Sequence, residues 1–181
     1  MAPATKPETK PQPKAKLLGK PARQWVLWVH VLASMLWLGS AVAMMVLTFA
    51  KGSRPSNAGE LYGFCLAIKL IDDWVIIASC GLSAVSGMLL SWKTPWGFFR
   101  WWWVAVKLVV TVLLLIVGAS LLGPWINETE AIARAHGWDA LGMPRYATVE
   151  RRVTVLGTIQ LGVLGFILYA SILKPWGKLR A

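Results

Sequence analysis

The chain has 181 residues, of which 56% are hydrophobic and only 15% are charged, a balance too apolar for a soluble domain of this length. The net charge of +11 would suit a nucleic-acid-binding protein, but the basic residues lie in a tail and between apolar runs, so we expect no nucleic-acid partner. Composition and charge instead favour one membrane domain whose main partner is the lipid bilayer.

Residues 1–24 are basic and rich in proline, and they lack any apolar periodicity. We expect a solvated cytoplasmic tail there, and its prolines, Pro21 included, argue against a helix. The apolar run at 25–49 follows. A cleaved signal peptide has an apolar centre of about 7 to 15 residues, and this run is roughly twice as long, so we interpret it as a retained membrane anchor.

The second apolar stretch follows a loop rich in Gly, Pro and Ser at 51–59. Asn57 with Glu60 three positions later forms a weak capping box, which predicts a helix from near Ala58 to Trp92. This helix is longer than a bilayer requires. We therefore place the membrane span at 70–92 and the first turns of the helix in the interface.

The third span is predicted at 101–123, where about twenty apolar residues carry a single charge, Lys107. A short connection broken by Pro95 and Gly97 precedes it, so the second and third helices form an antiparallel hairpin. After Gly123 and Pro124 the chain becomes polar. We expect a separate short interfacial helix there from about Trp125 to Ala135, stopped by Gly137.

The fourth span is predicted at 153–173 and is closed by Lys174 and Pro175. At about 1.5 Å per residue, each apolar stretch crosses the roughly 30 Å hydrocarbon layer of a bilayer. The predicted fold is therefore an all-α polytopic membrane protein. Its membrane domain at 25–178 is an antiparallel bundle of four transmembrane helices.

Lysine and arginine gather on the side of the bilayer that carries both termini, which predicts that both ends of the chain are cytoplasmic. Tryptophan follows the same side, where an amphipathic ring is favoured at the membrane interface. The predicted interfacial anchors are Trp25, Trp28, Trp92, Trp96, Trp101, Trp102, Trp103 and Trp176.

Two ionisable side chains fall inside the predicted spans, and such residues invite a functional question because hydrocarbon disfavours charge. His30 and Lys107 lie at similar depths from the cytoplasmic side, and Ser86 and Tyr169 reach about the same layer from the other two helices. We therefore predict a candidate polar cluster of His30, Ser86, Lys107 and Tyr169. The alternative is structural: Lys107 extends to the headgroups, and His30 bonds across one helix pair.

Haem b is the sharpest cofactor hypothesis for His30, although we expect no bound cofactor. The other histidine, His136, is predicted on the opposite side of the bilayer, which leaves His/Met, His/Lys or five-coordinate ligation. Copper transport remains an alternative, but no Met-rich or His-rich motif supports it and we predict no metal ligands. Cys65 and Cys80 are fifteen residues apart in one predicted helix, too far to form a disulfide.

Several segments resemble a bacterial integral-membrane family, domain of unknown function 2269, which is itself similar to copper-resistance D membrane domains. The similar segments are WVHVLASMLWLGS at 28–40, LLSWKTPWGFFRWWWVAVKLVV at 89–110, LGPW at 122–125 and SILKPW at 171–176. This resemblance implies four spans and no established reaction. A weaker one, to the four-helix membrane protoporphyrinogen oxidase, implies functional roles for His30 in the first helix and Lys107 in the third.

The sequence contains no GxSxG, P-loop, HExxH or dinucleotide motif. We predict a non-catalytic accessory subunit that docks onto a larger membrane complex, of the electron-transport or photosynthetic kind, in the bacterial cytoplasmic (inner) membrane. One alternative is a small haem-binding or redox protein that uses His30 and Lys107. The other is a copper or proton transporter.

Overall fold

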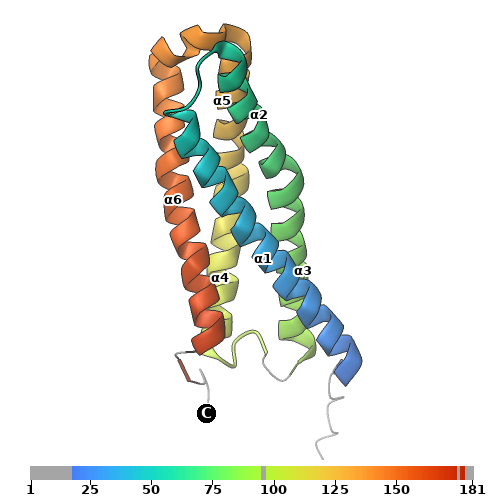
Figure 1. The fold of residues 1–181 in the computed structure, drawn as a ribbon. Helices are drawn as coiled ribbons and strands as arrows, with labels where there is room; N and C mark the ends of the chain where they lie inside the picture. The colour runs from blue at the N-terminus through green and yellow to red at the C-terminus, as the bar shows by residue number, and fades with distance from the viewer. Residues whose placement is uncertain (1–17, 95–96, 175, 178–181) are drawn as a thin grey trace, which may run out of the picture.

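The computed structural model describes residues 18–94, 97–174 and 176–177 (Figure 1). Its elements are α1 (Lys20–Lys51), α2 (Ala58–Leu70), the π-helical turn η1 (Ile71–Ile76), α3 (Ile77–Lys93), α4 (Trp102–Val117), the π-helical turn η2 (Gly118–Leu122), α5 (Gly123–His136), the 3-10 turn η3 (Gly137–Gly142) and α6 (Pro144–Leu173). They form four long rods that run alternately up and down. The predicted all-α antiparallel four-helix bundle is confirmed.

The two ends of the bundle differ (Figure 1). The terminal end holds the start of α1, the end of α6 and the connection between α3 and α4. The opposite end, here called the cap, consists of α2, α5 and η3 with the last turn of α1 and the first turns of α6. The cap closes the bundle at this end, and it has a small hydrophobic cluster of its own.

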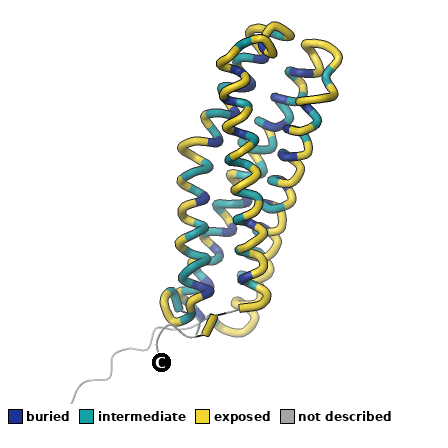
Figure 2. Tube along the Cα trace, turned by 90° about the vertical axis from the view of Figure 1, so that its left-hand side faces the viewer, coloured by how far each residue is buried: buried dark blue, intermediate teal, exposed yellow. Residues whose placement is uncertain are grey.

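Exposed positions run along most of the bundle length (Figure 2), and many of them carry large apolar side chains. In the described part of the chain four helices are long and apolar enough to cross a membrane. In the third and the fourth, only 11% of the most apolar stretch is buried inside the protein. Exposing so much apolar surface to water would be unfavourable, whereas lipid accepts it. The chain is therefore a multi-pass membrane protein whose outer surface meets lipid.

The second rod begins where the capping box predicted it. Asn57 is the N-cap of α2, and its side-chain oxygen accepts a hydrogen bond from the Glu60 N–H at 3.0 Å. The Glu60 carboxylate in turn accepts from the Ser56 N–H at 2.7 Å, one residue earlier than in the usual box. The rod continues through η1 to Lys93, so that α2 extends the helix beyond the span.

Asn57→Ala should lower the free energy of unfolding by about 1 kcal/mol, because the first turn of α2 loses its side-chain acceptor. Unfolding in mixed micelles, followed by tryptophan fluorescence, would measure the change. Asn57→Asp keeps the acceptor and should match the wild type. Equal losses in both variants would contradict a capping role.

The third rod does not break at Gly123 and Pro124, and the predicted separate interfacial helix at 125–135 is wrong in that respect. A proline in a regular helix clashes with the carbonyl four residues earlier. Here the Gly123 N–H bonds to the Gly118 oxygen, five residues earlier, so η2 shifts the backbone register just before Pro124. The helix therefore runs on to His136, and it ends at Gly137 as predicted, where φ is +55°.

The first rod begins at Lys20, inside the segment 1–24 predicted as an extended tail. Pro21 lies in the first turn of α1, where its missing N–H has no helical partner to lose. The prediction therefore failed for the last residues of the tail. The rest of it, at 1–17, lies outside the described residues.

The core consists of small clusters along the axis, without a large central one. Trp37, Leu114 and Leu164 form the middle cluster, and the cap has its own cluster around Leu61 and Tyr146. The most extensive contact between rods joins α1 to α3. This α1–α3 seam carries buried serines, namely Ser40, Ser79, Ser83 and Ser86. Small residues let membrane helices approach closely, so the seam holds the bundle together at its terminal half.

Candidate functional site

His30 lies in the α1–α3 seam and binds α3 through one ring nitrogen. Its Nδ1 is 2.9 Å from the Ser83 carbonyl oxygen and 3.1 Å from Ser86 Oγ. A carbonyl only accepts, so Nδ1 carries the proton and donates. Ser86 Oγ gives its own hydrogen to the Leu82 carbonyl at 2.6 Å and is free to accept from His30. In the neutral ring the other nitrogen, Nε2, then carries no proton, and it has no hydrogen-bond partner among the described residues.

Small residues around His30 set its orientation. Ser34 Oγ donates to the His30 carbonyl at 2.8 Å and lies 2.7 Å from Ser83 Oγ. On α3, Gly87 leaves room for the imidazole: a Cβ at this position would lie 3.0 Å from His30 Cε1. The ring is thus fixed by a hydrogen bond on one edge and by a glycine surface beside it.

A hydrogen bond joins two members of the predicted cluster, His30 and Ser86. Lys107 makes no hydrogen bond or ion pair in the described part of the chain, and its ammonium lies 5.9 Å from the centre of the Trp103 ring. Tyr169 is 52% exposed, whereas its neighbour Ala170 is fully buried. Tyr169 therefore faces outward from α6, and its predicted place in an inward-facing cluster is corrected.

The tryptophans predicted as interfacial anchors differ in how far they are exposed. Five of them are exposed at the terminal end: Trp25, Trp28, Trp92, Trp102 and Trp176. Trp103 is instead buried, with the ammonium groups of Lys107 and Lys174 within 6 Å of its ring centre, so it is a packing residue and no surface anchor. Trp101 is half-buried, and Trp96 lies outside the described residues.

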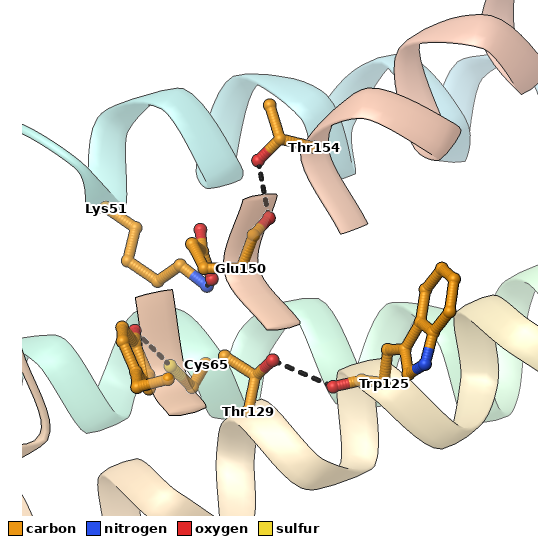
Figure 3. A network of polar contacts seen from close by, with 7 residues as sticks. Lys51, Cys65, Trp125, Thr129, Glu150 and Thr154 are labelled. Carbon is orange, nitrogen blue, oxygen red and sulfur yellow. Dashed lines mark hydrogen bonds and ion pairs between the residues drawn. The ribbon is translucent and has the colours of Figure 1, made fainter. Parts of the chain in front are cut away.

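A second polar cluster, which the sequence did not indicate, lies in the cap (Figure 3). Lys51 Nζ contacts Glu150 Oε2 at 2.7 Å, and the two side chains are only 4% and 22% exposed. The sequence placed Lys51 in a loop, but it is the last residue of α1 and points into the cap. The sequence does show a lysine at the end of the first apolar stretch, Lys51, and a glutamate just before the fourth span, Glu150. These opposite charges beside two membrane spans were the only sign of the pair in the sequence.

Residues from α2 and α5 complete this cap cluster. Cys65 Sγ lies 3.7 Å from the Tyr146 hydroxyl, and Thr129 Oγ1 donates to the Trp125 carbonyl at 2.8 Å. Burial raises the pKa of both the Cys65 thiol and the Tyr146 phenol, so both groups are neutral at pH 7 in this region beyond the apolar spans. A void of about 10 Å³ lined by Lys51, Cys65 and Thr129 has room for about one water molecule.

The two clusters differ in what they can do chemically. In the cap cluster an ion pair joins α1 to α6 and a weak hydrogen bond joins α2 to α6, while α5 packs against them through Ala133, which is a structural arrangement. In His30 the hydrogen bond from Nδ1 to the Ser83 carbonyl orients the ring and leaves Nε2 of the neutral imidazole able to bind a metal. Imidazoles that bind metals in proteins are commonly held in this way. Within the described ranges, no group of three or more His, Cys, Asp and Glu residues is placed to hold a metal ion.

Comparison of the chain with protein-family models, with curated proteins and with solved structures finds no match. The resemblance of residues 28–40 and 89–110 to a bacterial membrane family therefore stays a prediction. The structure does establish a four-helix, multi-pass membrane bundle. In it His30 of α1 is hydrogen-bonded to α3, and Lys51 is paired with Glu150 in the cap.

Proposed function

We propose that this protein is a non-catalytic subunit of a larger membrane-protein complex, of the electron-transport or photosynthetic kind, in the bacterial cytoplasmic membrane. The observation that carries the proposal is an exposed aromatic surface at the terminal end. The rings of Trp25 and Trp28 meet edge to face at 5.9 Å and are 68% and 57% exposed. Phe166 and Trp176 form a second partly exposed pair, with ring centres 6.2 Å apart.

Aromatic side chains are enriched where proteins bind one another, because they bury a large area at a small entropic cost. The first turns of α1 diverge from α6 toward the terminal end (Figure 1), and Trp25 and Trp28 on these turns are exposed. A membrane belt of tryptophan would look similar, since indole also favours the headgroup layer. The test must therefore separate a protein contact from a lipid contact.

A photoreactive amino acid placed at position 25 or 28 in the native membrane separates them. Docking predicts one discrete, heavier crosslinked product that also co-purifies at fixed stoichiometry in mild detergent. Positions 112 and 113 on α4 are matched controls, because Val112 and Leu113 are exposed apolar residues in mid-span and should label lipid. If all four positions give only the 19.9 kDa chain, the docking proposal is wrong.

The orientation proposed for this subunit places the terminal end in the cytoplasm. Lys20, Arg23, Lys93, Arg100 and Lys174 lie at this end, and positive residues are retained on the cytoplasmic side of bacterial membranes. Cysteine labelling with an impermeant maleimide tests it on two single substitutions. Gly19→Cys should react only after the membrane is opened, and Ser53→Cys, in the loop before α2, should react in intact spheroplasts. The reverse pattern would invert the topology.

Haem binding through His30 is the second candidate, and the hydrogen bonding of the ring favours it. An imidazole that ligates a metal usually donates its other N–H to a carbonyl or carboxylate, as Nδ1 does here to Ser83. Haem b would supply one-electron chemistry, and this chain would hold and orient it through Nε2. The absorption spectrum of the purified protein with added haem should then show a Soret band that His30→Ala removes and Tyr169→Phe keeps. No band in the wild type would exclude this candidate.

A further inference from the structure

A shallow groove of about 430 Å³ separates the upper part of α1 from α2 on the outside of the cap. Its residues come from three segments: α1, the loop after it, and one face of α2. They are Leu47, Arg54, Glu60, Gly63, Phe64 and Ala67. This volume falls in the range of small-molecule binding sites, about 300 to 1,000 Å³.

Apart from Arg54 and Glu60 the lining of the groove is apolar, and Gly63 adds no side chain to it. Phe64 and Ala67 follow Glu60 and Gly63 at helical spacing, so these four residues share one face of α2, and Leu47 of α1 lies opposite them. A Cβ at Gly63 would meet no atom within 4 Å. The apolar part of the groove therefore offers an open surface along which an acyl chain can lie.

The rim of the groove carries two opposite charges that are not paired with each other. Arg54 and Glu60 are both exposed, and neither takes part in an ion pair within the described ranges. One oxygen of Glu60 accepts from the Ser56 N–H, which fixes the carboxylate at the start of α2. A ligand that carries one negative and one positive group would therefore meet a matching charge for each.

We propose that this groove binds a zwitterionic glycerophospholipid of the ethanolamine type. The phosphate contacts Arg54, the ammonium contacts Glu60, and one acyl chain lies along Leu47, Phe64 and Ala67. The groove runs from its charged rim down toward the apolar span that begins near residue 70, so a lipid enters it from the adjoining leaflet with its usual orientation. A purely anionic lipid fits less well, because Glu60 repels it.

Native mass spectrometry of the full chain, titrated with phosphatidylethanolamine or phosphatidylglycerol of the same acyl chains, tests the proposal. The wild type should retain more of the ethanolamine lipid. Gly63→Leu fills the groove and should reduce this binding to background. Gly81→Leu, on α3 at a site equally open to an added Cβ, should bind like the wild type. Both substitutions replace a helical glycine, so neither is expected to weaken its helix.

Charge variants test the rim separately from the groove. Glu60→Gln keeps a side-chain oxygen that can accept the Ser56 N–H but removes the charge. It should lower retention of the ethanolamine lipid relative to the glycerol lipid by about threefold, the effect expected for an exposed charge pair. Arg54→Gln should weaken both lipids. Equal binding of the two lipids by the wild type, or unchanged binding in Gly63→Leu, would overturn the proposal. An acidic peptide that competes with the lipid and is lost in Arg54→Gln alone would assign the groove to a protein partner.

Discussion

Glu150→Leu is expected to lower the free energy of unfolding by about 3 to 5 kcal/mol, the usual cost of leaving a buried charge without its partner. The charge left behind is the ammonium of Lys51, whose side chain is only 4% exposed and whose one ion pair among the described residues, at 2.7 Å, is with Glu150. The ring of Tyr146 has its centre 6.0 Å from the Lys51 ammonium and compensates little. Unfolding of the purified bundle in mixed micelles, followed by tryptophan fluorescence, measures the loss.

Two further variants show whether charge or packing causes this loss. Lys51→Met leaves Glu150, which is 22% exposed and can reach water, so the loss should be smaller than in Glu150→Leu. The double variant Lys51→Met/Glu150→Leu removes both charges and should recover most of the stability. Arg145→Gln breaks the exposed pair with Glu128 and serves as the control, with a change of about 1 kcal/mol or less. A double variant as unstable as Glu150→Leu would show that shape, and not charge, matters in the cap.

Gly87→Ala should destabilise the bundle by about 1 to 3 kcal/mol, the usual cost of overpacking a closely packed interior. The new Cβ would lie 3.0 Å from His30 Cε1 and 3.4 Å from Nδ1. The imidazole cannot move away without lengthening its hydrogen bond to the Ser83 carbonyl. This loss opposes the gain of about 1 kcal/mol that alanine normally gives over glycine in a helix. The same unfolding assay measures the net effect.

Gly81→Ala is the matched control, since a Cβ there meets no atom within 4 Å, and it should be neutral or slightly stabilising. His30→Ala in the Gly87→Ala background removes the clash. The double variant should therefore be more stable than the sum of the two single losses predicts. Strict additivity would mean that the imidazole ring does not pack on Gly87.

The fold was predictable because lipid imposes a simple rule on a chain. Backbone groups in hydrocarbon must bond within their own segment, so runs such as 101–123 and 153–173 had to be helices long enough to cross. Capping residues made some helix ends predictable as well: Asn57 marks the start of α2, and Gly137 marks the end of α5. The error at Pro124 has a local cause: a π-helical turn lets a helix accommodate a proline that would normally end it.

The candidate site was predicted only in part, because depth can be read from a sequence more easily than direction. Counting residues from the membrane edge placed His30 and Ser86 in one layer, and they lie in hydrogen-bond contact. The same count included Tyr169, which shares the layer but faces away from the bundle. Successive residues of a helix point in directions about 100° apart. An error of one position in assigning the inward face is therefore enough to place an outward-facing residue inside the bundle.

The sequence by itself determined that this chain crosses the membrane with four helices, since hydrophobic length is a property of each segment alone. Only the tertiary structure decided which polar groups meet. Lys51 and Glu150 are ninety-nine positions apart, and His30 and Ser86 are fifty-six apart, so no local pattern links them. Such pairs depend on how helices rotate about their axes when they pack, and that rotation is set by many small contacts between different segments.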